Sequence, residues 1–292
     1  MKNPKISIII VYYHVKKELF DCLRSIYDSK PKTKIEILIV DNDEIKSIGK
    51  DLKKKFPKVK YVESKINGFG AGNNLGAKYA KGDYLFFLNP DTLLVGNPID
   101  KLFSFAEKNK NLGVVAPLLL DEKGISSPMQ GSRDLTAMRA IFSLSFLSKL
   151  FPNNKIRKNY WQLDWNKKTN KSVTNVPGTA FVIKKTVFEE VEGFDERFFL
   201  YFEEFDLCKR LVSKGYKNFI IPSAKVVHLW ERSTSQRSDI DEIFAKSRKY
   251  FFKKHYGFIL GKITDFFVGF GKKELILASI VFTNFIIRKK FT

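Results

Sequence analysis

In the first 65 residues, short continuous apolar runs typical of buried strands alternate with segments whose apolar residues recur at helical spacing. Ile6–Tyr12 is apolar at nearly every position, which is typical of a parallel strand covered by helices on both faces. Residues 16–27 then place their apolar side chains at helical spacing. The alternation repeats as a strand at 35–40, a helix at 45–56 and a short strand at 59–62. Strands that alternate with helices predict βαβ units and a largely parallel sheet.

A short aromatic run at residues 84–88 ends abruptly in Asn89-Pro90-Asp91. Pro90 has no N–H to donate to a sheet, so we expect the strand to end there. Asp91 would then stand at the carboxyl end of a strand, where open α/β sheets hold their ligands. A carboxylate beside an amide suits Mg²⁺ or Mn²⁺ on a phosphate. The alternative is a plain turn with an Asp cap.

A segment rich in glycine and asparagine, residues 67–76, predicts a turn that opens into a helix ending near Ala80. Gly68, Gly70 and Gly72 would let backbone N–H groups approach an anion at the helix start. No Gly-Lys-Ser/Thr follows, so this is not a Walker A loop. Most such loops are only turns, and that alternative stays open.

The hydrophobic periodicity weakens in the middle of the chain. After a helix at 99–108 and a buried strand at 112–120, residues 121–174 show little periodicity apart from an amphipathic helix at 137–150. Long irregular inserts in compact domains are often functional, so we assign this one to acceptor recognition. The alternative is a surface excursion packed by its own aromatic residues.

An aromatic stretch, residues 193–202, leads to Glu203 and Glu204 at the start of a helix that runs to about residue 214. Two adjacent acids after an apolar stretch suit a general base with a raised pKa. The structural alternative is that these acids complement the helix dipole, while Asp206 and Arg210 form an i,i+4 ion pair.

His228 ends one more short strand, residues 224–228. It is either a metal ligand or a capped surface histidine. Arg232 and Ser233 follow closely and would be able to meet a phosphate.

Charge sets this chain apart from an ordinary globular protein. Its 292 residues include 52 basic and 31 acidic ones, a net charge of +21. Such a field attracts nucleic acid, anionic lipid or phosphorylated substrates.

The two cysteines, Cys22 and Cys208, give neither a metal spacing nor a disulfide framework, which fits a reducing compartment. The first apolar run is a buried strand rather than a signal peptide, and no 18-residue apolar stretch predicts a spanning helix.

Residues 246–292 concentrate the positive charge, with eleven Lys or Arg and two acids. Aromatic and aliphatic residues recur among them, and a second apolar run occupies 275–287. A basic, aromatic, amphipathic helix is typical of one that lies on an anionic membrane surface. The alternative is a helical hairpin that packs on the domain or on a partner chain.

Taken in order, these segments resemble the family 2 inverting glycosyltransferases of the GT-A fold, especially bacterial rhamnosyltransferase-like enzymes of cell-surface polysaccharide synthesis. The resemblance covers roughly residues 5–235. It implies a GT-A (Rossmann-like), mostly parallel α/β sheet flanked by helices in residues 1–235. The composition of residues 236–292, beyond the resemblance, predicts a basic amphipathic helical tail. The motifs that carry the resemblance are Ser7 to Tyr13, Val40-Asp41-Asn42, Asn67 to Gly76, Leu88-Asn89-Pro90-Asp91, Pro177-Gly178-Thr179-Ala180, and Gly193-Phe194-Asp195-Glu196 through Glu203-Glu204-Phe205-Asp206.

The resemblance also implies roles for individual residues. Asp91 would be the remaining carboxylate of the family's metal-binding Asp-x-Asp position, for Mg²⁺ or Mn²⁺. His228 would help to hold the metal or the diphosphate, and Asp41 would bind the base of the donor nucleotide. The other expected donor-site residues are Tyr12, Asn67, Gly68, Asn74 and Asn89.

Glu204 stands where such enzymes usually carry the aspartate that acts as general base. Because Glu is one methylene longer, Glu203 remains a rival for this role, and Asp206 a weaker one. A second departure is Tyr13, where an Asn is common.

The implied reaction is the transfer of a sugar, by a hexosyltransferase, from a dTDP- or UDP-sugar to a glycan or lipid-linked acceptor. Rhamnose is the expected sugar, and the expected location is the cytoplasm, at the inner face of the cell membrane. A sugar-1-phosphate nucleotidyltransferase is the enzymatic alternative, but it would need a basic Gly-rich loop where this chain has Tyr13-His14-Val15. A non-enzymatic membrane- or nucleic-acid-binding module is the other alternative; no recognised nucleic-acid module occurs, so we expect no nucleic-acid partner.

Overall fold

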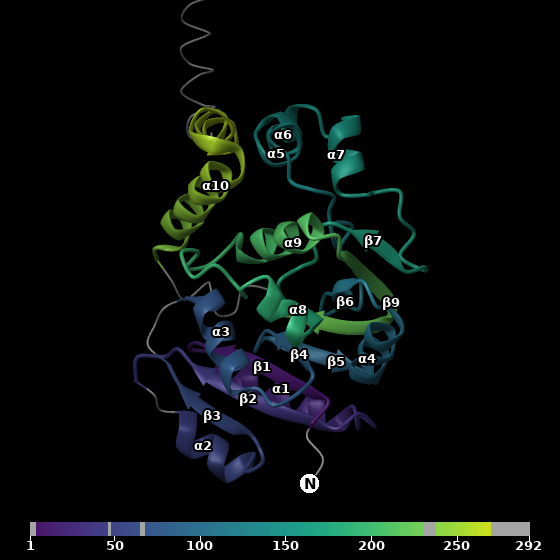
Figure 1. Ribbon diagram of the computed structural model, residues 1–292, viewed down its shortest axis with the longest axis vertical. Helices are drawn as coiled ribbons and strands as arrows, with labels where there is room; N and C mark the ends of the chain where they lie inside the picture. Colours follow the sequence, from purple (N-terminus) through teal and green to yellow (C-terminus); the bar gives the residue numbers. More distant parts are fainter. Residues whose placement is uncertain (1–3, 46–47, 65–67, 230–237, 270–292) are drawn as a thin grey trace, which may run out of the picture. The chain divides into compact units, whose positions relative to one another are not determined.

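The computed structural model describes residues 4–45, 48–64, 68–229 and 238–269 (Figure 1). Its residues pack into two compact units. The first comprises residues 1–134 and 161–247, and the second comprises 135–160 and 248–292. The predicted domain boundary after residue 235 and the apolar run at 275–287 lie outside the described residues, as do Asn67, Arg232 and Ser233.

The first unit is built on a mixed sheet of nine strands formed by the described residues. The strands are β1 (Ile6–Tyr12), β2 (Ile35–Asp41), β3 (Lys60–Glu63), β4 (Tyr84–Leu88), β5 (Thr92–Val95), β6 (Leu112–Leu120), β7 (Lys171–Val173), β8 (Ala180–Lys184) and β9 (Lys217–His228). Their order is β3-β2-β1-β4-β8-β6-β9-β5, and β7 also pairs with β9. The neighbours from β3 to β4 pair in parallel, whereas β8 is antiparallel to both β4 and β6. The predicted α/β fold is confirmed.

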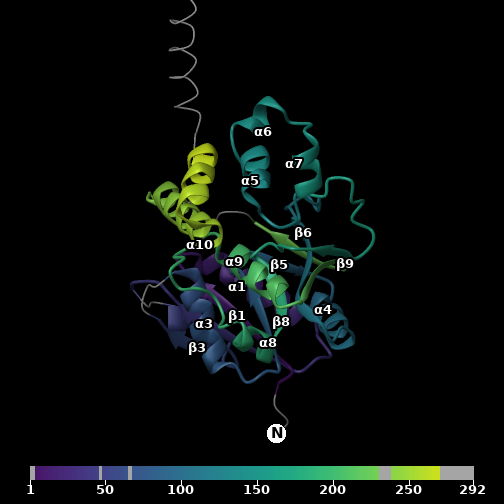
Figure 2. The same ribbon diagram turned by 45° about the horizontal axis from the view of Figure 1, so that its top comes forward.

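Helices cover both faces of this sheet. They are α1 (Lys16–Asp28), α2 (Ile48–Lys55), α3 (Phe69–Tyr79), α4 (Pro98–Lys108), α8 (Lys185–Glu190) and α9 (Glu203–Ser213). Ile8 and Ile10 of β1 pack in one core cluster with the buried residues of α1, α2 and α4. Ile9 and Val11 face the other way, into a cluster with residues of α3, α8 and α9. Helices α8 and α9 lie side by side over the sheet in both views (Figure 1 and Figure 2). The two-faced packing of β1 explains its unbroken apolar run.

The predicted glycine-rich turn is wrong from residue 69 onward, because α3 begins at Phe69. A Cβ on Gly76 would lie 2.4 Å from Ile9 Cγ2, and a Cβ on Gly72 would lie 3.0 Å from the Val11 side chain. These glycines let α3 pack directly on β1, and only Gly68, at a φ of 92°, precedes the helix. Close packing rather than a loop conformation therefore accounts for the glycines at 72 and 76.

The second unit contains the middle part of the weakly periodic insert, residues 135–160. The single helix predicted at 137–150 is divided into α5 (Ala137–Leu144) and α6 (Leu147–Leu150), and α7 (Lys155–Tyr160) follows. The break occurs at Ser145, whose extended backbone ends α5 and whose hydroxyl accepts a 3.0 Å hydrogen bond from Leu147 N. A side chain that bonds its own backbone in this way competes with the helix.

The predicted C-terminal helical segment is present in the described part of the chain as α10 (Ile240–Gly269). It changes direction at Gly257, where φ is 74°. Tyr256, just before this kink, donates a hydrogen bond to the Leu135 carbonyl and so ties the helix to the insert. Within the residues that the structure describes, no helix has the length and apolarity needed to cross a membrane.

Candidate active site

A cavity of about 360 Å³ opens in the first unit at the carboxyl ends of β1, β2 and β4. Segments far apart in the sequence form its walls, as expected for a ligand site at the end of an open α/β sheet. Its lining includes Val11, Tyr13, Asn42, Gly68, Phe69, Asn89, Pro90, Asp91, Leu119, Ser127, Met129, Gln130, Pro177, Gly178, Thr179, Phe199, Leu200, Tyr201, Glu203, Glu204 and His228.

Asp91 and His228 meet at this cavity although they are far apart in the sequence. Antiparallel pairing of β5 with β9 sets Thr92 opposite His228, and the Asp91 carbonyl accepts a 2.9 Å hydrogen bond from Leu229 N. His228 Nε2 consequently lies 3.5 Å from Asp91 Oδ1. Both side chains are buried, with 2% of Asp91 and 7% of His228 exposed.

The residues around Asp91 fit a divalent metal. Asp91 Oδ1 and Asn89 Oδ1 are buried oxygens that accept no hydrogen bond from any described residue, and both residues line the cavity. A buried carboxylate oxygen without a donor is costly unless a cation balances it. Carboxylate and amide oxygens are hard ligands that suit Mg²⁺ or Mn²⁺.

Glu203 and Glu204 begin α9 on another wall of the same cavity. Each has a buried Oε2 that finds no hydrogen-bond partner among the described residues. Burial raises the pKa of Glu204 to about 7, although backbone N–H groups at the helix start oppose the shift. Burial, and then the charge of Glu204, raise the pKa of Glu203 well above its ordinary value. A carboxylate with a pKa near 7 is suited to accept a proton at neutral pH.

The motif Pro177-Gly178-Thr179 leaves room for the longer side chain at position 204. A Cβ added to Gly178 would lie 3.4 Å from both Cβ and Cγ of Glu204. The Glu204 side chain therefore packs directly against the backbone of Gly178. Asn89 N donates a 2.8 Å hydrogen bond to the Thr179 carbonyl, so the same motif also connects to the end of β4.

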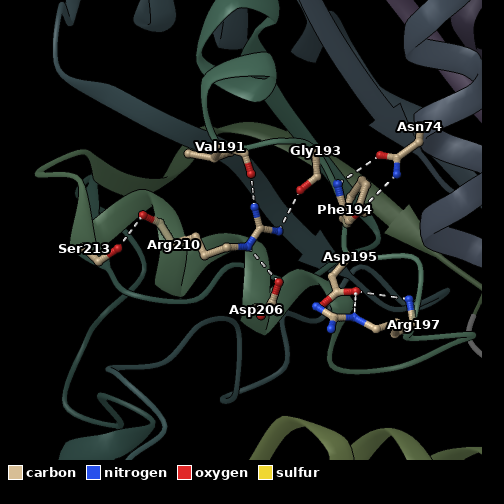
Figure 3. A network of polar contacts seen from close by, with 9 residues as sticks. All are labelled: Asn74, Val191, Gly193, Phe194, Asp195, Arg197, Asp206, Arg210 and Ser213. Carbon is tan, nitrogen blue, oxygen red and sulfur yellow. Dashed lines mark hydrogen bonds and ion pairs between the residues drawn. The ribbon is translucent and has the colours of Figure 1, made fainter. Parts of the chain in front are cut away.

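Asp206 is held in a structural ion pair (Figure 3). Arg210 Nε donates a 2.8 Å hydrogen bond to Asp206 Oδ2, which confirms the predicted i,i+4 pair. The two terminal nitrogens of Arg210 bind the carbonyls of Val191 and Gly193, the latter at 2.7 Å. Asp206 is fully buried and is not among the residues that line the cavity. Its geometry gives no support to a role as general base.

Asn74 fastens the loop that precedes α9, as Figure 3 also shows. Its Nδ2 donates to the Phe194 carbonyl and its Oδ1 accepts from Phe194 N, both at 2.9 Å. Nδ2 also lies 2.9 Å from Glu196 Oε1. Asn74 does not line the cavity, so its predicted donor contact stays a prediction.

Two further donor-site predictions fall on side chains that bond within the protein. Asp41 is fully buried, and its two oxygens accept from Tyr61 Oη at 2.6 Å and from Asp43 N at 2.9 Å. Tyr12 is 3% exposed; burial and then the charge of Asp43 raise its pKa to about 12. Neither Asp41 nor Tyr12 lines the cavity, and Asn67 lies outside the described residues, whereas Gly68 and Asn89 do line it.

Sequence reasoning missed Asn42 as a site residue. Its Nδ2 donates a 3.0 Å hydrogen bond to the Gly68 carbonyl, while its buried Oδ1, on the cavity wall, has no donor among the described residues. Its place directly after a buried strand was the available signal. Met129 and Gln130 were also missed; Gln130 bonds both backbone groups of Leu119, at 2.9 and 2.7 Å, and so holds this part of the insert on the cavity.

Most of the first unit matches a known protein family. Residues 7–192 match the model of the family described as Glycosyl transferase family 2. The chain belongs to glycosyltransferase family 2. The predicted resemblance is therefore confirmed, and so is the assignment of this chain as a glycosyltransferase. The family match also favours glycosyl transfer over the nucleotidyl transfer considered above.

Curated relatives of this glycosyltransferase are distant. It is 26% identical over 214 residues to the N-acetylglucosaminyl-diphospho-decaprenol L-rhamnosyltransferase of Mycobacterium tuberculosis, which covers 69% of each chain. Rhamnosyltransferase WbbL of Escherichia coli is 22% identical over 250 residues, covering 79% of this chain and 88% of WbbL. The low-salt glycan biosynthesis hexosyltransferase Agl10 of Haloferax volcanii is 26% identical, covering 70% and 61%.

Solved structures share the fold of the glycosyltransferase. The crystal structure of GalNAc-T7 with UDP, GalNAc and Mn²⁺ superposes with a TM-score of 0.59 at 18% identity, over 78% of this chain and 44% of that one. S. aureus TarS gives 0.53 at 16% identity, over 86% and 39%. This chain spans less than half the length of either structure, and the likeness confirms the predicted GT-A fold alone.

The family match does not reach every wall of the cavity. The matched residues, 7–192, include Asn89 and Asp91, whereas Glu203, Glu204 and His228 lie beyond them. The assignment of Glu203, Glu204 and His228 to the site of this glycosyltransferase therefore rests on geometry, because all three line the cavity that Asp91 also lines.

Proposed function

We propose that this glycosyltransferase inverts the anomeric configuration as it moves a sugar from a nucleoside-diphosphate donor to a hydroxyl of a glycan or lipid-linked acceptor in cell-surface polysaccharide synthesis. The observation that carries the proposal is the shared cavity of Asp91 with His228 and Glu204. It brings residues suited to a diphosphate and its metal into one cavity with a carboxyl group suited to proton transfer. The names of the relatives, two of them rhamnosyltransferases, support the reaction class.

The donor diphosphate belongs beside Asp91, Asn89 and His228, which would together hold Mg²⁺ or Mn²⁺. A bound metal would neutralise charge that develops on the departing diphosphate. Asn42 Oδ1, on the same cavity, is placed to accept a hydrogen bond from the donor. These side chains stand on strand ends, so they hold the donor in a fixed orientation, and positioning of this kind supplies much of a transferase's rate.

Glu204 acts as the general base. As the acceptor oxygen forms its bond to the anomeric carbon, the bond from that carbon to the diphosphate oxygen breaks on the opposite face. The acceptor hydroxyl proton passes to the Glu204 carboxylate, whose pKa of about 7 is suited to accept it at neutral pH. Glu203 is the alternative base, and the variants Glu203→Gln and Glu204→Gln distinguish the two.

The donor we favour is dTDP-rhamnose, with UDP-hexoses as the alternative. Much of the cavity wall is apolar, and Leu119, Met129, Phe199 and Leu200 contribute to it. A 6-deoxy sugar carries a methyl group where a hexose carries a hydroxymethyl group, and apolar surface receives a methyl group at lower cost in desolvation.

We further propose that the second unit binds an anionic membrane surface, so that the enzyme acts peripherally at the inner face of the membrane. The helix beyond Gly257 exposes several large apolar side chains beside lysines. The most exposed are Phe258 at 60%, Ile259 at 75% and Phe266 at 62%; Lys262 lies among them, and Lys253 and Lys254 precede the kink. This combination is typical of helices at an anionic interface. Packing on a partner chain is the alternative.

Thermal unfolding tests the donor site. Wild type and Asp91→Ala are melted with UDP, dTDP or GDP, each with and without Mn²⁺. A nucleotide at 100 times its Kd should stabilise wild type by about 2.7 kcal/mol. We expect one nucleotide to raise the Tm in a Mn²⁺-dependent manner, and the rise to vanish in Asp91→Ala. No shift with any nucleotide, or an equal shift in the variant, would contradict the proposal.

A further inference from the structure

The turn that delivers Glu203 and Glu204 has an unfavourable backbone conformation. Tyr201 and Phe202, directly before α9, have φ values of 70° and 68°. Left-handed conformations cost roughly 1–2 kcal/mol for each L-residue because Cβ approaches the following carbonyl oxygen. Such residues persist only where the surroundings determine their conformation, and they cluster at functional sites. The question is which contacts impose this turn.

The upstream side of the turn is fixed by α3. Phe69 N donates a 2.8 Å hydrogen bond to the Phe199 carbonyl. Gly68 packs so closely there that a Cβ would lie 2.1 Å from the Phe199 oxygen. Phe198 is fully buried. These contacts end at residue 199, one residue before the turn itself.

The turn itself is contacted by the first two turns of α10. Ser247 Oγ donates a 2.7 Å hydrogen bond to the Leu200 carbonyl, and Ser247 is only 4% exposed. The ring of Phe244 lies against the next two residues, with its centroid 5.3 Å from that of Tyr201 and 5.4 Å from that of Phe202. All five residues belong to the first unit.

We propose that Phe244 and Ser247 are positioning residues, which hold Tyr201 and Phe202 in the left-handed conformation and thereby fix Glu203 and Glu204 on the cavity wall. The catalytic consequence rests on the proposed function, whereas the holding of the turn does not. Leu200 and Tyr201 line the cavity together with the two acids, so a shift of the turn moves the wall and the base together.

Loss of these contacts should affect the chemical step more than donor binding. Asp91 is held by β4 and β5, and its carbonyl bonds Leu229 N, so the diphosphate end of the cavity does not depend on α10. A misplacement of about 1 Å at the reacting atoms can cost on the order of 100-fold in rate. We therefore expect Phe244→Ala and Ser247→Ala to lower kcat about 10- to 100-fold and to raise the donor KM by a smaller factor, because only Leu200 of the moving wall is assigned to the donor sugar.

Two measurements on the full chain test the proposal. The first, hydrogen–deuterium exchange of the amides of residues 199–205, needs neither donor nor acceptor. The second is turnover with dTDP-rhamnose or UDP-glucose, read as nucleotide release across pH 5–9. Phe244 is 38% exposed, so its truncation should leave the enzyme folded, which the Tm checks. Ser247→Thr keeps the hydroxyl and should restore slow exchange and kcat.

Matched controls come from outside this contact. Ser213→Ala removes an exposed hydroxyl that donates a 2.8 Å bond to the Arg210 carbonyl at the other end of α9. Tyr79→Ala removes an aromatic ring that is 56% exposed at the end of α3. Both controls should leave exchange in 199–205 and kcat unchanged.

We expect faster exchange in residues 199–205 for both test variants, together with the loss of kcat. Because burial raises the Glu204 pKa, a loosened turn should also shift the acid limb of kcat to lower pH. Unchanged exchange would overturn the proposal, as would faster exchange with unchanged kcat. If wild type turns over no donor, the proposed function fails, and the exchange measurement still decides whether Phe244 and Ser247 hold the turn.

Discussion

At the scale of single residues, the burial that suits the Glu204 carboxyl to its proposed role as general base also lowers the stability of the folded state. Burial raises its pKa to about 7, whereas an exposed glutamate in the unfolded chain titrates near 4.3. Between these values the folded state binds more protons than the unfolded state. The free energy of unfolding therefore falls as pH rises through this window, and the penalty is complete above pH 7.

Replacement of the acid by its neutral amide should remove this penalty. We expect Glu204→Gln to match wild type in stability near pH 3.5, below the unfolded pKa, and to exceed it by about 1–3 kcal/mol at pH 8. Urea unfolding at several pH values measures the difference. Glu189→Gln, at a side chain that is 60% exposed, is the control and should show no such trend. A constant difference between Glu204→Gln and wild type across pH would contradict the burial of this carboxyl.

Asp91, Glu204 and His228 were named from the sequence alone, and the structure places all three on one cavity. The proximity of Asp91 to His228 was not predictable, because it depends on the pairing of β5 with β9. Asp41 is a similar case. Its motif is visible in the sequence, but the hydrogen bond between its carboxylate and Tyr61 is visible only in the fold.

At the scale of elements, long apolar runs and regular helical spacing gave reliable predictions. Strands β1, β2, β4 and β6 were predicted within a residue of their observed bounds, because each is buried on both faces. The short strands β5 and β7 and helix α8 were missed, because few residues and mixed polarity leave little periodicity. Helix α3 was misread because glycine favours turns locally, whereas here Gly76 is required by the nearby β1 side chains.

The junction between α3 and the loop before α9 supplies a test at this scale. Gly68 and Gly215 have similar φ values, 92° and 89°. A Cβ at 68 would lie 2.1 Å from the Phe199 oxygen, whereas a Cβ at 215 meets nothing within 4 Å. Both alanine variants bear the backbone strain of a positive φ, but only Gly68→Ala also breaks the packing of α3 on this loop.

We expect Gly215→Ala to lower the free energy of unfolding by about 1 kcal/mol and Gly68→Ala by at least 2 kcal/mol more. The midpoint of urea unfolding gives both values. Equal losses in the two variants would show that the Phe199 carbonyl does not pack tightly on Gly68.

At the scale of the whole molecule, a net charge of +21 acts together with exposed apolar side chains on the second unit. Positive charge draws the protein to an anionic surface, and buried apolar area holds it there. The sequence predicted the basic, amphipathic character of the C-terminal segment. It did not predict that residues 135–160 pack with residues 248–269, because that association depends on tertiary contacts.

Sedimentation with lipid vesicles tests the membrane proposal. We expect wild type to bind phosphatidylglycerol vesicles, to bind phosphatidylcholine vesicles weakly, and to be released by salt. Phe258→Ser with Phe266→Ser, at side chains that are 60% and 62% exposed, should weaken binding at least tenfold. Val212→Ser, 40% exposed on α9, is the control. Equal binding by the double variant would exclude this helix as the membrane contact.

The measurement that tests the central claim most directly is sugar transfer by wild type, Glu203→Gln and Glu204→Gln. The donors are dTDP-rhamnose and UDP-glucose, the acceptors are free and lipid-linked glycans, and the product is detected by mass spectrometry. We predict transfer by wild type, and a kcat at least 100-fold lower in Glu204→Gln with the donor Kd unchanged. Transfer by Glu204→Gln at the wild-type rate, or no transfer by wild type that binds the donor, would contradict the account.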